Sequence, residues 1–280
     1  MVTVTKIDAP CGAVIGDVDL SAPLGGEDLK TIRRAWMAHH VLVFRNQKLE
    51  NEDLVRFAEY MGPIGDDPFI RPIDGHEKIA AIHRRADETG RIFADNWHSD
   101  WSFMPVPPAG TLLYGIVIPP EGGDTFFSNQ HLALEKMPAE MRARFEDRVA
   151  VHSAKKAYSR DGVYSKAHFG GAMRIAVSDE ANKIERHNII RAHPESGKAG
   201  IFGGSYVVDL EGLDPAEADA MIEELTAWQD REEFVYRHKW EPGMLVIWDN
   251  RSVLHRASGG YEGHERRLHR LTIADNPAYY

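Results

Sequence analysis

The chain of 280 residues is 43% hydrophobic and 27% charged, a composition typical of a globular protein and not of a disordered one. Its 33 Lys and Arg stand against 43 Asp and Glu, and the net charge of -10 disfavours nucleic acid as a partner, although a local basic pocket could hold a small anion. The single cysteine, Cys11, excludes an internal disulfide, and no apolar run reaches the roughly 18 residues of a membrane span. These features predict a cytoplasmic protein with no membrane partner, and they leave a homo-oligomer open.

The first third of the chain combines short strands with amphipathic helices. Its predicted elements, in order, are strands at residues 2–7 and 13–20, a helix at 27–40, a strand at 41–44 and a helix at 51–61. Asn51 is expected to cap the second helix. Residues 64–95 follow without clear periodicity, apart from a short strand at 78–83. They fit either a lid over a binding site or an ordinary solvent loop.

The rest of the chain is richer in strands. Its predicted elements, in order, are strands at 111–118 and 125–127, helices at 129–135 and 138–146, strands at 148–153, 188–191 and 200–202, a helix at 215–230, and strands at 233–240, 244–248, 252–257 and 268–274. Residues 154–186 lack periodicity and are a second candidate lid. This order predicts one domain over residues 1–280, of α+β, mainly β class, with a double-stranded β-helix (jelly roll) core flanked by helices. A regular parallel α/β sheet is the alternative.

The segment Asn96-Trp97-His98-Ser99-Asp100-Trp101 contains a candidate pair of metal ligands. On an extended backbone, side chains two residues apart share a face, so His98 and Asp100 could bind one cation from one side. The pair alone is weak evidence, because about two His-x-acid pairs are expected by chance in this composition. The other such pair, His193-Pro194-Glu195, runs into the turn residues Ser196-Gly197 and is interpreted as a surface loop.

His255 is the candidate third ligand, and the strand that follows it supplies the reason. In Arg266-Arg267-Leu268-His269-Arg270, a strand would place Arg266 and Arg270 on one face. Two arginines that face an apolar core would be costly unless each met an anion there. An anionic co-substrate and an anionic substrate would supply those partners. A basic edge strand in water is the alternative for one of the two faces.

Together these motifs resemble the taurine dioxygenase family of Fe(II)- and 2-oxoglutarate-dependent oxygenases, which includes the phenoxyacetate-type herbicide dioxygenases. The resemblance spans nearly the whole chain, and it rests on the segment Asn96 to Asp100, on Gly122-Gly123-Asp124-Thr125, on Trp248-Asp249-Asn250-Arg251 through His255, and on the closing arginine strand. A 2-His-1-carboxylate triad leaves positions open for a co-substrate and dioxygen. The resemblance therefore implies that His98, Asp100 and His255 are the catalytic iron ligands.

The same resemblance implies roles for further residues. Thr125 and Arg266 would hold the distal carboxylate of 2-oxoglutarate, and Arg270 would meet the acidic group of the substrate. Asn96, Tyr158 and Tyr206 would line the substrate pocket. Asp67 stands where a taurine-specific enzyme has a sulfonate-binding histidine, so taurine is disfavoured.

The implied reaction is the hydroxylation of a small organic anion, a carboxylate, sulfonate or sulfate ester, with dioxygen and 2-oxoglutarate consumed and succinate and CO2 released. Two alternatives from other classes remain at this point. One is a zinc-dependent hydrolase, which has no need for Thr125 and Arg266 at these places. The other is a non-catalytic small-anion binding protein on the same fold.

Overall fold

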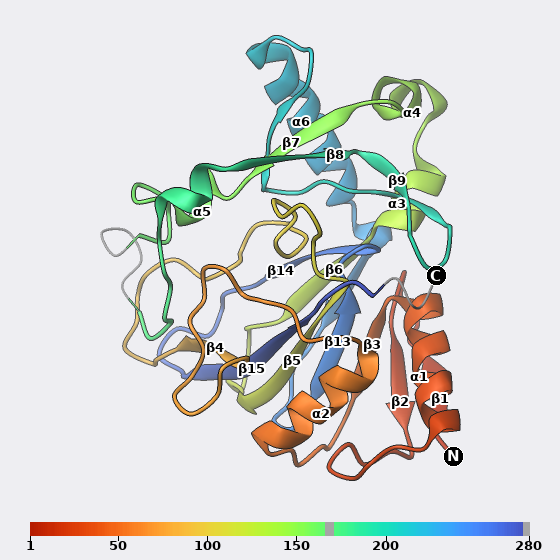
Figure 1. Ribbon diagram of the computed structural model, residues 1–280, viewed down its shortest axis with the longest axis vertical. Coiled ribbons are helices and arrows are strands. Elements are labelled where there is room, and N and C mark those ends of the chain that lie inside the picture. The colour runs from red at the N-terminus through yellow and green to blue at the C-terminus, as the bar shows by residue number, and fades with distance from the viewer. Residues whose placement is uncertain (166–170, 277–280) are drawn as a thin grey trace.

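The computed structural model describes residues 1–165 and 171–276, and its largest sheet has seven strands. Across the sheet these strands are β1 (Thr3–Lys6), β2 (Ala13–Gly16), β3 (Val41–Phe44), β13 (Leu245–Asp249), β5 (Gly110–Val117), β15 (Arg266–Ile273) and β4 (Ala80–Arg84). Neighbours are antiparallel, except that β2 and β3 are parallel. The sheet therefore joins strands from both ends of the chain (Figure 1).

A second sheet of three strands faces the first. It consists of β12 (Val235–His238), β6 (Thr125–Asn129) and β14 (Val253–Ala257), with β6 in the centre. Phe127 of β6 packs against Trp248 of β13, with ring centroids 5.5 Å apart. An apolar cluster that includes both rings fills the space between the two sheets.

Strand β13 shows how alternation in the sequence builds these layers, because successive side chains of a strand point to opposite faces. Val246 and Trp248 point into the cluster between the sheets. Leu245 and Ile247 belong to a different cluster, which the helices α1 (Gly26–His39) and α2 (Asn51–Met61) cover. The continuous run of apolar residues in β13 thus reflects burial on both faces (Figure 1).

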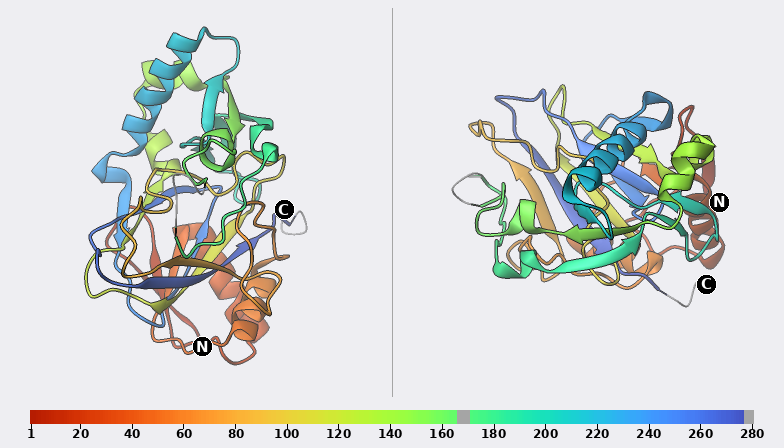
Figure 2. Two further views of the ribbon diagram at one scale, coloured as in Figure 1. Left: turned by 90° about the vertical axis from the view of Figure 1, so that its left-hand side faces the viewer. Right: turned by 90° about the horizontal axis from the view of Figure 1, so that it is seen from above.

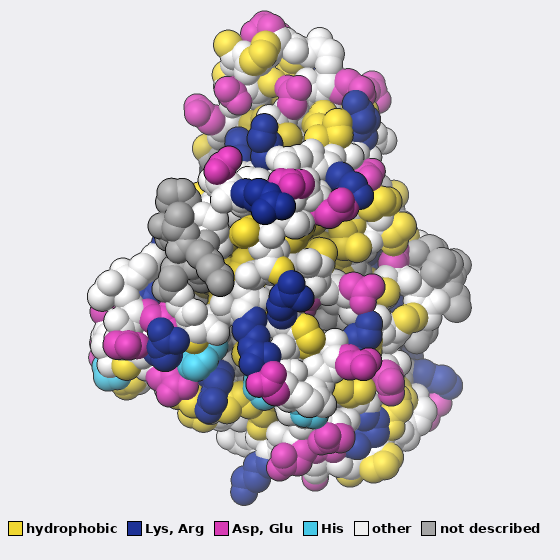
Figure 3. Space-filling view, turned by 60° about the vertical axis from the view of Figure 1, so that its left-hand side comes forward, with side chains coloured by type: hydrophobic (Ala, Val, Ile, Leu, Met, Phe, Trp, Pro, Cys, Tyr) yellow, Lys and Arg dark blue, Asp and Glu magenta, His cyan; other side chains and the backbone are white. Residues whose placement is uncertain are grey.

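The remaining elements pack beyond one end of the two sheets. They are a three-stranded sheet of β7 (Val149–Ser153), β8 (Ile184–Asn188) and β11 (Val207–Leu210), a hairpin of β9 (Ile190–Ala192) and β10 (Ala199–Ile201), the α-helices α3 (Gln130–Lys136), α4 (Ala139–Phe145), α5 (Lys155–Tyr158) and α6 (Pro215–Gln229), and short 3-10 helices at Asp179–Asn182 and Glu232–Phe234. Figure 2 shows α6 stacked with β7 and β8 at this end. Acidic and basic side chains are interspersed over the face shown in Figure 3.

The mainly β class with a few helices agrees with the prediction, and the five predicted helices recur as α1, α2, α3, α4 and α6. The short α5, β8 and β11 were not predicted, and the strand predicted at 188–191 corresponds to β9. Strand β8 is largely polar because its residues alternate between exposed and half-buried positions. The cap of α2 is Glu50, which forms a reciprocal capping box with Asp53. Asn51 is instead the first helical residue, and its side chain bonds His269.

The prediction that His193 and Glu195 lie in a surface loop is wrong for their side chains. The backbone does turn there, between β9 and β10, but His193 is 3% exposed and its Nε2 lies 3.0 Å from Asp249 Oδ2. Arg251 donates to Asp249 at 2.8 and 3.0 Å and to Glu195 at 3.2 Å. Arg33 of α1 forms two further bonds of 2.8 Å to Glu195. This polar cluster connects α1, the β9–β10 turn and the end of β13.

Two predictions from composition concern Cys11 and the membrane. Cys11 is a free, buried cysteine, and burial raises the pKa of its thiol to about 12. Such a thiol is unreactive at neutral pH. Within residues 1–165 and 171–276, every helix is too short or too polar to cross a bilayer.

The polar cluster gives a testable prediction about stability. Arg251→Met removes the cation that accompanies the fully buried carboxylate of Asp249, so the free energy of unfolding should fall by about 3–5 kcal/mol. Lys30→Met is the matched control, because Lys30 pairs with Glu27 on the exposed face of α1 and should change stability little. Urea denaturation of both variants measures the difference. Equal losses in the two variants would contradict a structural role for the cluster.

Candidate metal centre

The backbones of His98 and His255 form an isolated antiparallel β-bridge. His98 N donates to His255 O at 3.0 Å, and His255 N donates to His98 O at 2.9 Å. Two residues that exchange both backbone bonds lie directly opposite each other, with their side chains on one face. The bridge thus joins the segment at residues 96–101 to β14, and it brings the two imidazole rings to a centroid distance of 4.2 Å.

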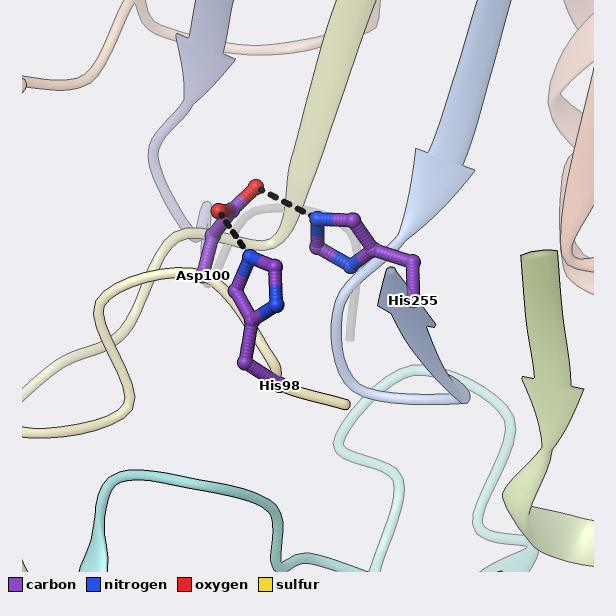
Figure 4. A group of neighbouring side chains, drawn as sticks. All are labelled: His98, Asp100 and His255. Atoms are coloured by element: carbon purple, nitrogen blue, oxygen red, sulfur yellow. Dashed lines mark ion pairs between the residues drawn. The ribbon is translucent and has the colours of Figure 1, made fainter. Parts of the chain in front are cut away.

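Asp100 completes a cluster of three metal-binding side chains with these histidines. Asp100 Oδ1 lies 3.6 Å from His98 Nε2, and Asp100 Oδ2 lies 3.6 Å from His255 Nε2. One donor atom from each residue falls within 4.8 Å of the others, and all three residues are buried (Figure 4). Residues 98–100 are not a regular strand as the spacing argument assumed, because the bridge is followed at once by a turn.

The surroundings of the two histidines orient the ring of His98 and favour the neutral, metal-binding form of His255. His98 Nδ1 lies 2.8 Å from the carbonyl oxygen of Asn96, so its N–H donates there and the Nε2 lone pair faces Asp100. Burial, together with the nearby His98, lowers the pKa of His255 well below its ordinary value. His255 Nδ1 has no hydrogen-bond partner in the described part of the chain, so no contact there selects its tautomer.

The surroundings of Asp100 favour its ionised form. Burial alone would raise the pKa of this carboxyl, but Arg270 and His255 lower it well below its usual range. Thr111 Oγ1 donates to Oδ2 at 2.6 Å, and one terminal nitrogen of Arg270 lies 3.2 Å from both oxygens. Two imidazoles and one carboxylate on one side of a cavity fit a metal with open coordination positions.

A cavity of about 260 Å³ opens directly above this cluster. All of the site residues predicted from the sequence border it: His98, Asp100, His255, Thr125, Arg266, Arg270, Asn96, Tyr158 and Tyr206. The rest of its wall is largely aromatic and aliphatic, with Phe93, Trp101 and Trp248 among the rings. This is the composition expected of a site for a small organic molecule.

Both candidate lid segments contribute to the wall of the cavity. Phe93 and Ala94 come from residues 64–95, and Tyr158 and Tyr164 come from residues 154–186. The hydroxyl of Tyr164 accepts a hydrogen bond of 3.0 Å from Ala94 N and so connects the two segments. Residues 166–170 of the second segment lie outside the described residues.

Arg266 reaches the cavity without a carboxylate partner in the described residues. Its Nε donates to the carbonyl oxygen of Gly123 at 3.1 Å, and the residue is 5% exposed. Gly123 has φ 66°, and a Cβ there would lie 2.8 Å from Arg266 Cδ, so glycine leaves room for the arginine. Burial lowers the pKa of Arg266. Thr125, the other residue predicted to hold 2-oxoglutarate, accepts 3.0 Å from Trp240 Nε1.

Arg270, by contrast, is already paired. It is 4% exposed, and besides its contacts to Asp100 it donates from Nε and a terminal nitrogen to Asp67 at 3.2 to 3.4 Å. Burial would lower the pKa of Arg270, but Asp100 and Asp67 raise it above its ordinary value. Trp101 Nε1 also donates to Asp67, at 2.7 Å. Trp101 has φ 48°, which bulky residues rarely adopt, so the surrounding contacts hold it there.

Two residues of the site carry no signal in the sequence. Thr111 begins a predicted strand like any other, and only the fold brings it to Asp100. Lys156 borders the cavity from α5, but in the sequence it is one of two adjacent lysines, and nothing distinguishes it from Lys155. The pairing of Asp67 with Arg270 depends on the path of residues 64–75, where the sequence has only turn signals.

Comparison with known proteins supplies the family. A sequence model of the taurine catabolism dioxygenase TauD, TfdA family matches residues 3–272. The chain is 33% identical over 284 residues to the alpha-ketoglutarate-dependent 2,4-dichlorophenoxyacetate dioxygenase of Cupriavidus pinatubonensis, covering 94% of each chain. It is 30% identical over 281 residues to the (S)-phenoxypropionate/alpha-ketoglutarate-dioxygenase of Sphingobium herbicidovorans, covering 98% of this chain and 96% of that one.

A solved structure agrees. The crystal structure of a taurine dioxygenase from Burkholderia xenovorans matches with a TM-score of 0.80 and 29% identity, covering 98% of this chain and 90% of that one. Alpha-ketoglutarate is 2-oxoglutarate. The chain therefore belongs to the taurine catabolism dioxygenase TauD, TfdA family, and it is an oxidoreductase that depends on Fe(II), 2-oxoglutarate and dioxygen.

Proposed function

We propose that this dioxygenase hydroxylates a small organic anion, a carboxylate, sulfonate or sulfate ester, with release of succinate and CO2. The observation that carries the proposal is the meeting of two features on one cavity. A buried His-Asp-His cluster borders it, and so does the buried Arg266, which lacks a carboxylate partner among the described residues. A metal hydrolase needs only the first feature.

In this proposal His98, Asp100 and His255 bind Fe(II). The bound iron with its co-substrate would activate dioxygen and supply the oxidising power for breaking a C–H bond. The protein itself supplies three donors on one side, keeps the His255 imidazole neutral and keeps Asp100 ionised. Thr111 and Arg270 hold the Asp100 carboxylate in a fixed orientation. A fixed carboxylate is a better ligand because less freedom is lost when the metal binds.

Arg266, helped by Thr125, is proposed to bind the distal carboxylate of 2-oxoglutarate. A guanidinium matches a carboxylate with two parallel hydrogen bonds, and the Gly123 carbonyl already fixes its Nε side. Burial makes an unpaired guanidinium costly, so a carboxylate bound there would relieve a desolvation penalty.

On the substrate side, Arg270, Asn96, Tyr158 and Tyr206 are proposed to border the substrate. Tyr158 and Tyr206 are buried, and burial raises the pKa of both phenols, so they remain neutral donors or acceptors. The aromatic wall would exclude water from the reacting atoms and would suit an apolar body on the substrate.

We also propose that the two facing sheets form the double-stranded β-helix (jelly roll) of a single dioxygenase domain over residues 1–280. The apolar cluster between the sheets and the bridge from β14 to the 96–101 segment support this assignment. The cavity then lies between elements of both sheets, with β6, β14 and β15 contributing Thr125, His255, Arg266 and Arg270.

The role of Arg266 predicts a selective effect on the co-substrate. In Arg266→Lys an ammonium group replaces the guanidinium, which can donate two parallel hydrogen bonds to one carboxylate. The dissociation constant for 2-oxoglutarate should therefore rise about tenfold or more, while that for the organic substrate should change little. Arg267→Lys is the control, because Arg267 is half-buried on the other face of β15. Anaerobic titration with each ligand makes the comparison. A change confined to substrate affinity would mean that Arg266 binds the organic substrate and not 2-oxoglutarate.

The substrate class is tested with a panel of carboxylates, sulfonates, sulfate esters and neutral analogues. Substrate-stimulated succinate release should be strongest with a mono-anion that carries an apolar body, because the cavity is largely aromatic. Carboxylates are expected ahead of sulfonates, and taurine is expected to be poor. Strong stimulation by a neutral compound, or by taurine at low concentration, would contradict this substrate class.

A further inference from the structure

Four cationic side chains border the cavity in the described residues, and three of them already have an assignment. The four are Arg91, Lys156, Arg266 and Arg270. Arg91 donates three hydrogen bonds to Asp95 at 2.8 to 3.0 Å. Arg266 is proposed to hold the co-substrate, and Arg270 is bound by Asp67 and Asp100. Lys156 forms no ion pair and no side-chain hydrogen bond with any residue in 1–165 or 171–276.

A count of the charges around the cavity also leaves Lys156 without a compensating anion. With Fe(II) and 2-oxoglutarate bound, the two charges of the metal balance the two carboxylates of the co-substrate. The carboxylates of Asp67 and Asp100 balance the guanidinium groups of Arg266 and Arg270. Lys156 is then the remaining uncompensated charge on the cavity wall in the described part of the chain. A substrate with one negative charge restores neutrality. Lys156 itself is exposed, so the charge that needs compensation is that of the substrate anion once it leaves water for the cavity.

Asp67 is the reason that Arg270 does not fill this role. Its carboxylate accepts from Nε and a terminal nitrogen of Arg270, which are the donors that a substrate anion would otherwise engage. The bond from Trp101 Nε1 holds Asp67 in place. A second anion beside Asp67 would meet repulsion from a carboxylate in a low-dielectric site.

The backbone around Lys156 is fixed by local hydrogen bonds. The carbonyl oxygen of Lys156 accepts 3.1 Å from Val163 N, and that of Ala157 accepts 3.0 Å from Tyr164 N. The neighbouring Tyr158 is buried in an aromatic cluster with Phe69 and Trp101. Local hydrogen bonds thus hold the backbone that carries Lys156, while its side chain is exposed and accessible to an entering anion.

We propose that Lys156, and not Arg270, binds the anionic group of the substrate, which is a mono-anion whose apolar body occupies the aromatic part of the cavity. The inference rests on the proposed function. Asp67 serves as the counter-ion of Arg270, and Lys156 sets the preference for a charged substrate from the α5 side of the cavity.

The test compares a carboxylate with its uncharged amide. Phenoxyacetate against phenoxyacetamide, and hexanoate against hexanamide, are titrated into protein with Fe(II) and 2-oxoglutarate under anaerobic conditions, and again into metal-free protein. Isothermal titration calorimetry reports the dissociation constants. Wild-type protein should bind at least one carboxylate about tenfold or more tightly than its amide. Lys156→Met should abolish that preference, whereas Lys155→Met, an exposed lysine of the same helix that does not border the cavity, should keep it.

A second variant tests the part assigned to Asp67. In Asp67→Asn with Lys156→Met, Arg270 loses one of its two carboxylate partners, so the preference for the carboxylate over the amide should return. If the double variant binds the carboxylate no more tightly than the amide, as Lys156→Met is expected to do, the role of Asp67 as counter-ion is overturned.

The remaining outcomes separate the inference from the proposed function. If Lys156→Met keeps the full preference for the carboxylate, Lys156 does not bind the anion, while an anionic substrate stands. If wild-type protein favours neither carboxylate over its amide, both the anionic substrate class and the role of Lys156 are overturned.

Discussion

The pair of backbone hydrogen bonds between His98 and His255 is the constraint on which the site depends. These residues are 157 positions apart in the chain, and the bridge fixes their separation through the main chain and not through mobile side chains. Asp100 then reaches both rings because only one residue separates it from His98. Ser99, between them, is buried and donates to the carbonyl oxygen of Asn250 at 2.8 Å, which ties this segment to the turn after β13.

The two buried arginines of β15 show how one sequence pattern leads to two different environments. Both lie on the same face of the strand, four residues apart, and both are about 5% exposed or less. Arg270 forms ion pairs with two carboxylates of the protein, whereas the side chain of Arg266 hydrogen-bonds only to a backbone carbonyl oxygen in the described residues. Because of this difference, Arg266 is the arginine that is available to bind a carboxylate of a ligand. It also makes Arg270 a structural partner of the metal ligand Asp100.

The parts of the site that the sequence predicts are local or repetitive. Alternation along β15 predicts the shared face of Arg266 and Arg270, because a period of two needs no knowledge of the fold. The pairing of Asp67 with Arg270 and the burial of His193 beside Asp249 could not be predicted in this way. Each joins a turn to a distant strand, and turn residues indicate a change of direction without indicating what their side chains meet. Strand β8 was not predicted for a related reason: its residues are exposed or half-buried, so its apolar pattern is weak.

The central claim is that His98, Asp100 and His255 bind Fe(II) together with 2-oxoglutarate, and absorption spectroscopy tests it most directly. Anaerobic addition of Fe(II) and 2-oxoglutarate to wild-type protein should give a weak visible charge-transfer band, which belongs only to iron chelated by the keto acid. Asp100→Ala should lose the band while keeping its fold by circular dichroism, and Asp66→Ala, an exposed acid paired with Lys78, should keep it. Absence of the band in wild-type protein, or an equal band in Asp100→Ala, would contradict the assignment of these three ligands.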